Sequence, residues 1–253
     1  GAKFITDAVT QWGTWQWPFY LRRCELTVRD IKAIDPDIIV QGSLNEYVRT
    51  PQLSNVGLIP KWVFEAFDLA YEERKFDMYQ MAYSDYKTNP NHRWSDKIDP
   101  TTNDYEDAIP DISTLEAKLW FYYQARLFVD YGCESLSFSQ VELMNQTTNS
   151  TEHWSVVFDK VRAYAASSDQ VRFLLISGHT DGMIDANGQL LFDLHLGPSR
   201  IQECGPVIHP NGGHGIIKNT PCVHSSYNIS LGGITPSGWN CDHTPLLVFI
   251  DNK

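Results

Sequence analysis

Two glutamates follow the apolar parts of two strand-like segments. Glu46 closes residues 37–46 and Glu142 closes residues 134–142. Parallel strands covered by helices carry continuous apolar runs, and α/β barrels keep their catalytic groups at the carboxyl ends of such strands. Two carboxylates from such strand ends are the minimum equipment for hydrolysing a glycosidic bond. We predict that Glu46 and Glu142 form a catalytic pair; the alternative is that each pairs with Arg or Lys, or caps a following helix.

Other polar and aromatic side chains lie in or beside the predicted strands. Asn45 precedes Glu46 and suits a sugar hydroxyl, while Gln140 and Glu142 are two residues apart and should point to one side of their strand. A buried Asp or His needs either a substrate or a hydrogen-bonded partner in the core. Indole rings stack on sugar faces, although most tryptophans serve packing. The predicted substrate-binding residues are Asp7, Trp12, Gln41, Asn45, Gln140, His179, Asp193, His195 and Trp239.

Strand-like and helix-like segments alternate along the chain, as in parallel α/β folds. Helices are predicted at 21–35, from Pro60, from a Ser113/Glu116 capping box to Gly132, and at 151–166. The predicted strands are 4–9, 37–40, 77–83, 134–141, 172–177, 190–196, 227–231 and 246–251. The fold class that this order favours is α/β, a single (β/α)8 TIM-like barrel over residues 1–253 that is irregular in its last third. An open doubly wound sheet is the alternative.

Three Asn-x-Ser/Thr sequons and five cysteines bear on the compartment. The sequons at Asn145, Asn149 and Asn228 indicate a secreted glycoprotein. Cys204 and Cys222 flank a loop rich in Gly, Pro and His, and they are the best candidates for a disulfide. We therefore expect an extracellular, secreted protein.

Composition and missing motifs exclude several functions. The net charge of −11 argues against nucleic acid as a partner, and no apolar run approaches the roughly 20 residues of a membrane span. The chain has no G-x-S-x-G elbow, phosphate loop, H-E-x-x-H or Cys-x-x-Cys motif. We predict no cofactor and no metal site.

Five stretches resemble a poorly characterised group of secreted, glycoside-hydrolase-like barrel domains found in large extracellular proteins, notably of polysaccharide-degrading bacteria. They are residues 1–5, 58–67, 110–123, 138–144 and 232–241. The resemblance implies a barrel and an extracellular setting, without an established activity. Asn45-Glu46 is also similar to the acid/base pair of the large retaining glycosidase clan; there the pair ends strand four, whereas here it ends the second predicted strand.

Two functions stay open at this point. The first is a carbohydrate-active, glycoside-hydrolase-like barrel that binds or hydrolyses a glycan or polysaccharide through its strand-end carboxylates. The second is a non-catalytic secreted glycoprotein that serves as a structural, homo-oligomeric or assembly-forming subunit. The sequence leaves open whether the chain is an enzyme.

Overall fold

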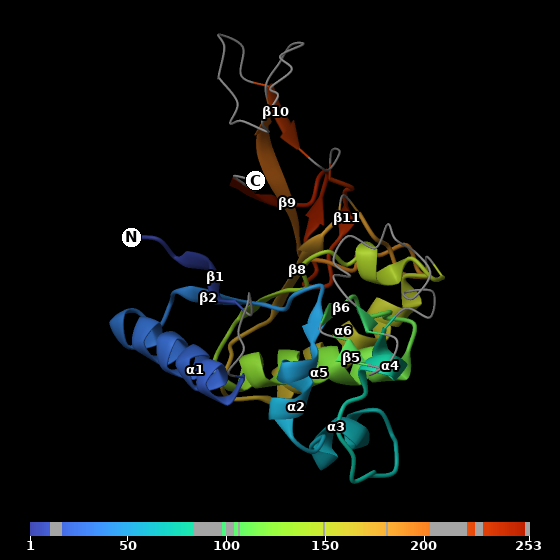
Figure 1. Cartoon of the computed structure of the whole chain (residues 1–253). Coiled ribbons are helices and arrows are strands. Elements are labelled where there is room, and N and C mark those ends of the chain that lie inside the picture. Colours follow the sequence, from blue (N-terminus) through green and yellow to red (C-terminus); the bar gives the residue numbers. More distant parts are fainter. Residues whose placement is uncertain are drawn as a thin grey trace, which may run out of the picture.

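A curled, mostly parallel sheet with helices against it forms an α/β fold in the computed structural model (Figure 1). The structure describes residues 1–10, 17–82, 98–99, 104–105, 107–148, 150–180, 182–202, 222–225 and 230–250. The strands of the main sheet are β1 (Phe4–Thr10), β2 (Ile39–Ser43), β7 (Ser135–Ser137), β8 (Leu175–His179), β9 (Leu194–Gln202), β10 (Cys222–Ser225) and β13 (Leu246–Ile250).

The strands are wound in one direction. The order β1-β2-β7-β8-β9 follows the chain, and β13 adds to β9 in parallel, while β10 is antiparallel to β9. This order does not reverse, unlike that of a doubly wound sheet. The six parallel strands of the described chain form half of a barrel, so the prediction of a complete (β/α)8 barrel was wrong in extent.

Three long helices join the first four parallel strands. These are α1 (Trp17–Ile34), α5 (Leu115–Asp130) and α6 (Glu152–Ser167), and η1 (Leu143–Asn145) precedes α6. From β8 to β13 the described residues contain no helix, in agreement with the predicted irregular last third. The short elements are β3 (Val48–Arg49), α2 (Thr50–Val56), α3 (Lys61–Ala66), α4 (Met78–Met81), β4 (Ile98–Asp99), β5 (Asp104–Tyr105), β6 (Asp107–Ala108), β11 (Gly233–Ile234) and β12 (Asn240–Cys241).

An aromatic core joins α5 and α6 to one face of the sheet. Trp154 lies 5.2 Å from Phe121 and 5.3 Å from Phe158, ring centre to ring centre. Gly42 of β2 faces this layer, and a Cβ there would lie 2.8 Å from the Phe128 ring of α5. A larger residue would therefore push the helix away from the sheet.

The opposite face of the sheet is polar. Serines alternate with apolar residues along β7. In the register of β2 and β7, Gln41 lies opposite Ser135 and Ser43 lies opposite Ser137. Ser137 in turn lies opposite Ser177 of β8. The Gln41 amide donates to Ser135 Oγ (3.1 Å) and Ser177 Oγ (3.2 Å), across three strands. Partners in register share a face, so the concave side of the half-barrel carries hydrogen-bonding groups.

Several predicted elements are confirmed and two are corrected. Helix α6 and its buried face agree with the prediction for 151–166. Residues 77–83 contain α4 rather than a strand, because Asp77 accepts a hydrogen bond from the Tyr79 amide and caps a helical turn. Helix α5 is capped by Thr114 rather than Ser113, since Glu116 forms a bidentate ion pair with Arg74.

Candidate functional site

Glu46 is a buried carboxylate with two side-chain hydrogen-bond donors at the carboxyl ends of the parallel strands, which we call the carboxyl edge. It lies three residues after β2 and is only 3% exposed. Ser139 Oγ donates to one of its oxygens at 2.5 Å, and the Gln140 amide donates to the other at 2.7 Å. Both donors follow β7, the neighbouring strand, and both are uncharged. The protein therefore orients a buried carboxylate without neutralising it.

Two backbone positions at this side of the sheet are strained: Ser139, which contacts Glu46, and Asp7, which contacts Ser43. Asp7 and Ser139 have φ values of +49° and +47°, in the left-handed region that few side chains favour. Asp7 interrupts the pairing of β1 with β2, where the register shifts between Ile5 and Val9. Non-glycine strain of this kind gathers at functional sites, where it holds a side chain in one place.

Asp7 is exposed and accepts a hydrogen bond from Ser43 Oγ of β2. His179 ends β8, and its backbone amide donates to the Ser139 carbonyl at 2.6 Å. Burial lowers the pKa of His179, and the nearby carboxylates of Glu46 and Asp7 raise it without cancelling the effect of burial. Four neighbouring strands, β1, β2, β7 and β8, thus supply Asp7, Ser43, Glu46, Ser139 and His179.

Glu142 occupies a different position. Strand β7 ends at Ser137, so residues 138–142 do not alternate as predicted, and Glu142 has helical backbone angles at the start of η1. Its side chain is exposed and accepts a hydrogen bond from Thr180 Oγ1 at 2.6 Å. Gln140 and Glu142 therefore point to different partners, correcting the prediction that they share one side.

Two buried amides, one in β2 and one next to Glu46 in the sequence, retain unused hydrogen-bonding atoms. Gln41 Oε1 and Asn45 Nδ2 are buried and have no hydrogen-bond partner among the described residues. A buried amide that lacks a partner is costly. One acceptor and one donor therefore remain for a hydroxylated ligand or for water.

Asp193 and His195 do not join the carboxylates. Asp193 lies just before β9, and its oxygens accept from Arg162 (2.9 Å), the Ile176 amide (2.8 Å) and the Ser237 amide (2.9 Å). His195 pairs in register with Gly178, so it faces the helices, and its ring lies 6.3 Å from Phe192. His195 and His179, both predicted to bind substrate, therefore lie on opposite faces of the sheet.

The remaining predicted residues are dispersed. Trp239 is 45% exposed in the β11–β12 turn, whereas Trp12, Asn149, Asn228 and Cys204 lie outside the described residues. Asn145 is 4% exposed, and this burial contradicts its prediction as a glycan acceptor. The structure describes the backbone of Cys222 in β10, and Cys24, Cys133 and Cys241 are free thiols, so the predicted disulfide stays a prediction.

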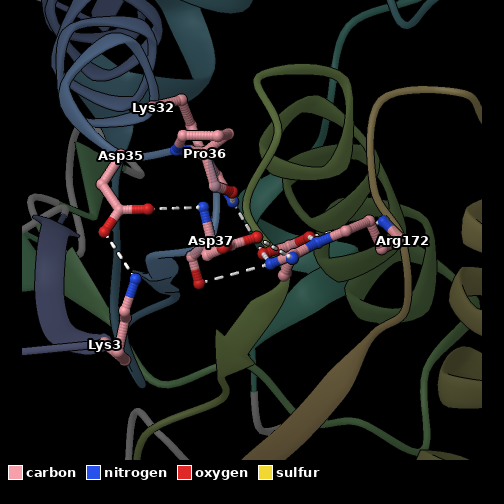
Figure 2. Close-up of polar contacts among 7 residues, drawn as sticks. Lys3, Lys32, Asp35, Pro36, Asp37 and Arg172 are labelled. Atoms are coloured by element: carbon pink, nitrogen blue, oxygen red, sulfur yellow. Dashed lines mark hydrogen bonds and ion pairs between the residues drawn. The ribbon is translucent and has the colours of Figure 1, made fainter.

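At the amino ends of the strands, which we call the amino edge, carboxylates are paired with Lys and Arg (Figure 2). Glu134 is 2% exposed and accepts from Lys32 at 2.7 Å and Arg172 at 2.6 Å. Arg172 also pairs with Asp37 at 3.0 Å. A cavity of about 480 Å³ opens here, and Lys32, Glu134 and Arg172 help to line it. The charges of Lys32, Glu134 and Arg172 therefore already neutralise one another within this cavity.

The other buried carboxylates follow the amino-edge pattern, with one exception. Glu116 pairs with Arg74 and Asp193 with Arg162, both at 2.9 Å. Asp111 lacks an ion pair in the described chain, but it accepts from the Ser113 amide and Thr147 Oγ1 at a turn before α5. Glu46 serves no such turn, and its setting therefore requires another explanation.

No group of three or more His, Cys, Asp or Glu side chains in the described chain is arranged to hold a metal ion. None of the described helices has the length and apolar character needed to cross a membrane. No known family model matches the chain, and no curated protein shows significant similarity to it.

Sequence reasoning included Gln140 but missed the three hydroxyl donors that hold the carboxylates. Ser43, Ser139 and Thr180 were not among the predicted site residues, although Ser43 alternates with Gln41 and the serines of β7 alternate with apolar residues. This alternation of polar and apolar residues was the available signal, because a parallel strand buried on both faces would lack it.

Proposed function

We propose that this chain is an extracellular carbohydrate-active protein that binds a glycan and hydrolyses a glycosidic bond at the carboxyl edge. Glu46 is the central carboxylate, and Glu142 contacts the glycan from the exposed rim. The observation that carries the proposal is that Glu46 is buried and held only by neutral donors. In the described chain, Glu116, Glu134 and Asp193 are instead neutralised by Arg or Lys.

The surroundings of Glu46 supply the other requirements of a glycan site. The free donor of Asn45 and the free acceptor of Gln41 match the mixed donor and acceptor character of sugar hydroxyls. A half-barrel wound in sequence also retains the strand-end arrangement on which barrel enzymes build their sites. The sequons and the resemblance to secreted hydrolase-like domains support an extracellular setting.

Release of reducing ends from a panel of plant and bacterial polysaccharides tests the proposal. We expect turnover by the native chain and a loss of about 10³-fold for Glu46→Gln, because an amide cannot exchange the proton that the reaction needs. The matched control is Glu72→Gln, which changes an exposed glutamate outside the candidate site and should leave the rate unchanged.

Binding to the same panel separates the two open functions. Neither binding nor turnover by the native chain would contradict the proposal and favour a structural glycoprotein. Turnover that survives Glu46→Gln would place the chemistry elsewhere in the molecule.

A further inference from the structure

Asp7 lies where a second reacting carboxylate would be needed. It lies in the bulge of β1 between the paired residues Ile5 and Val9, and its carboxylate accepts a hydrogen bond from Ser43 at the carboxyl end of the neighbouring strand β2, which leads to Glu46. Its φ of +49° breaks the pairing of the two strands. A regular strand would keep Asp7 in register, so the strained backbone fixes an orientation that regular pairing would not give.

Hydrogen bonds and electrostatics join Asp7 to Glu46 through two neighbours. Ser43, three residues before Glu46, donates to one Asp7 oxygen, and the other oxygen has no partner in the described structure. His179 is two residues from Ser177 in β8 and so points to the same face of the sheet, and the charges of Glu46 and Asp7 raise its pKa against the larger effect of burial. Ser139 completes the set, since its hydroxyl donates to Glu46 and its carbonyl accepts from the His179 amide.

Glu142 lacks these connections. It is exposed, belongs to the turn before α6, and is held by Thr180. Glu142 therefore fits contact with an extended ligand better than contact with the bond that is cleaved.

We propose that Asp7, rather than Glu142, is the carboxyl group that acts with Glu46 on the glycosidic bond, and that His179 carries a proton between them. This inference rests on the proposed function and names the second catalytic residue. Glu46 is suited to the base because two donors fix both of its oxygens as acceptors. Asp7 is suited to the acid because one of its oxygens remains open to the ligand.

The reaction adds one water across one bond. Protonated Asp7 gives its proton to the glycosidic oxygen as the bond from that oxygen to the anomeric carbon breaks. Glu46 takes a proton from the water whose oxygen bonds to the same carbon, so the configuration inverts. Neutral His179 then accepts the proton from Glu46 and returns it to Asp7, which restores the starting state.

Kinetics on a polysaccharide that the native chain cleaves compare two variants, because a sugar leaving group needs the proton that Asp7 would supply. Asp7→Asn keeps a residue that tolerates positive φ and should lower kcat about 10³-fold, whereas Glu142→Gln should lower kcat/KM less than about 10-fold. The matched control is Asp159→Asn on the exposed face of α6, which should behave like the native chain. If Glu142→Gln abolishes turnover while Asp7→Asn does not, or if the product retains its configuration, the inference fails and the proposed function stands.

Imidazole titration by NMR tests the same inference without a substrate. Removing either carboxylate should lower the pKa of His179 further, because each now favours the protonated ring. We expect this downward shift in Asp7→Asn and in Glu46→Gln, and no shift in Glu142→Gln. A His179 titration that is unchanged in Asp7→Asn would overturn the inference, whatever the substrate tests show.

Discussion

The two edges of one sheet hold carboxylates by opposite means. At the amino edge, Glu134 is paired with both Lys32 and Arg172. Arg172 also pairs with Asp37, and Lys3 pairs with Asp35 (Figure 2). At the carboxyl edge, three carboxylates accept hydrogen bonds from uncharged hydroxyl and amide groups. These carboxylates are Asp7, Glu46 and Glu142.

We interpret the ion pairs of the amino edge as contributions to stability, and the carboxylates of the carboxyl edge as groups for the proposed chemistry. A buried carboxylate that is paired with cations is stabilised in its charged form and contributes little else. A carboxylate held by neutral donors remains able to exchange a proton or contact a cationic transition state. Backbone strain follows the same division, since two of the three non-glycine residues with positive φ in the described chain are Ser139, which contacts Glu46, and Asp7, which contacts Ser43.

The largest stability effect is expected from Glu134→Gln. The change leaves Lys32 and Arg172 facing a neutral amide at a buried site. Breaking a fully buried ion pair costs about 3–5 kcal/mol, and because both cations are partly exposed we expect about 2 kcal/mol. Chemical denaturation measures the loss, and turnover at the carboxyl edge should not change.

The pH dependence of that loss provides a control. Burial alone would raise the pKa of Glu134, but the hydrogen bonds from Arg172 and Lys32 outweigh burial and lower it. A lowered pKa contributes stability above the unfolded value near 4.5, which is lost as the pH falls through the folded pKa. The native chain and Glu134→Gln should therefore converge at acid pH, and a constant gap would contradict the ion-pair explanation.

A second pH effect belongs to the carboxyl edge. The pKa of His179 lies below 6.5, so the unfolded chain binds the proton more readily than the folded chain. Stability from this group is complete above pH 6.5 and declines as the pH falls towards the folded pKa. His179→Gln should flatten that decline, as measured by denaturation from pH 7 to pH 5. An unchanged slope would show that His179 is not the titrating group.

Asp7→Gly should change the unfolding free energy by a smaller amount, and it tests whether the strained backbone at Asp7 serves function. Glycine adopts positive φ freely, although it loses more backbone entropy on folding. We expect a net stabilisation of about 0.5 kcal/mol together with loss of turnover, the trade-off typical of strained functional sites. Destabilisation by Asp7→Gly, measured in the same denaturation assay, would assign Asp7 a structural role.

The smallest effect is expected from Asp35→Asn. Asp35 and Lys3 form an ion pair at the surface of the amino edge, where water screens the attraction. No change in the thermal midpoint should be resolved. A clear decrease would show that the exposed pairs also stabilise this edge.

The sequence predicted the positions of the elements better than the contacts of the site. The apolar run before Gln41 predicted β2 and placed Glu46 at its carboxyl end, and the periodicity of 151–166 predicted α6. The early end of β7 could not be predicted, because Ser139 adopts a positive φ that no glycine announces. For the same reason the different directions of Gln140 and Glu142 were missed.

Two further differences have physical causes that lie far apart in the sequence. Glu116 does not complete a capping box because Arg74, 42 residues earlier, forms two hydrogen bonds with it. His195 faces the helices because β9 pairs with β8 through Gly178. Long-range pairing and register decide both, and neither is visible in a local pattern.

The unfolding free energy of Glu46→Gln, measured beside that of Glu134→Gln, tests the contrast between the edges most directly. A glutamine at position 46 can still accept from Gln140, and the Ser139 hydroxyl can turn to accept from it. We predict a change below about 1 kcal/mol for Glu46→Gln and a loss of about 2 kcal/mol for Glu134→Gln. An equal or larger loss for Glu46→Gln would show that Glu46 is a structural carboxylate and would contradict a functional carboxyl edge.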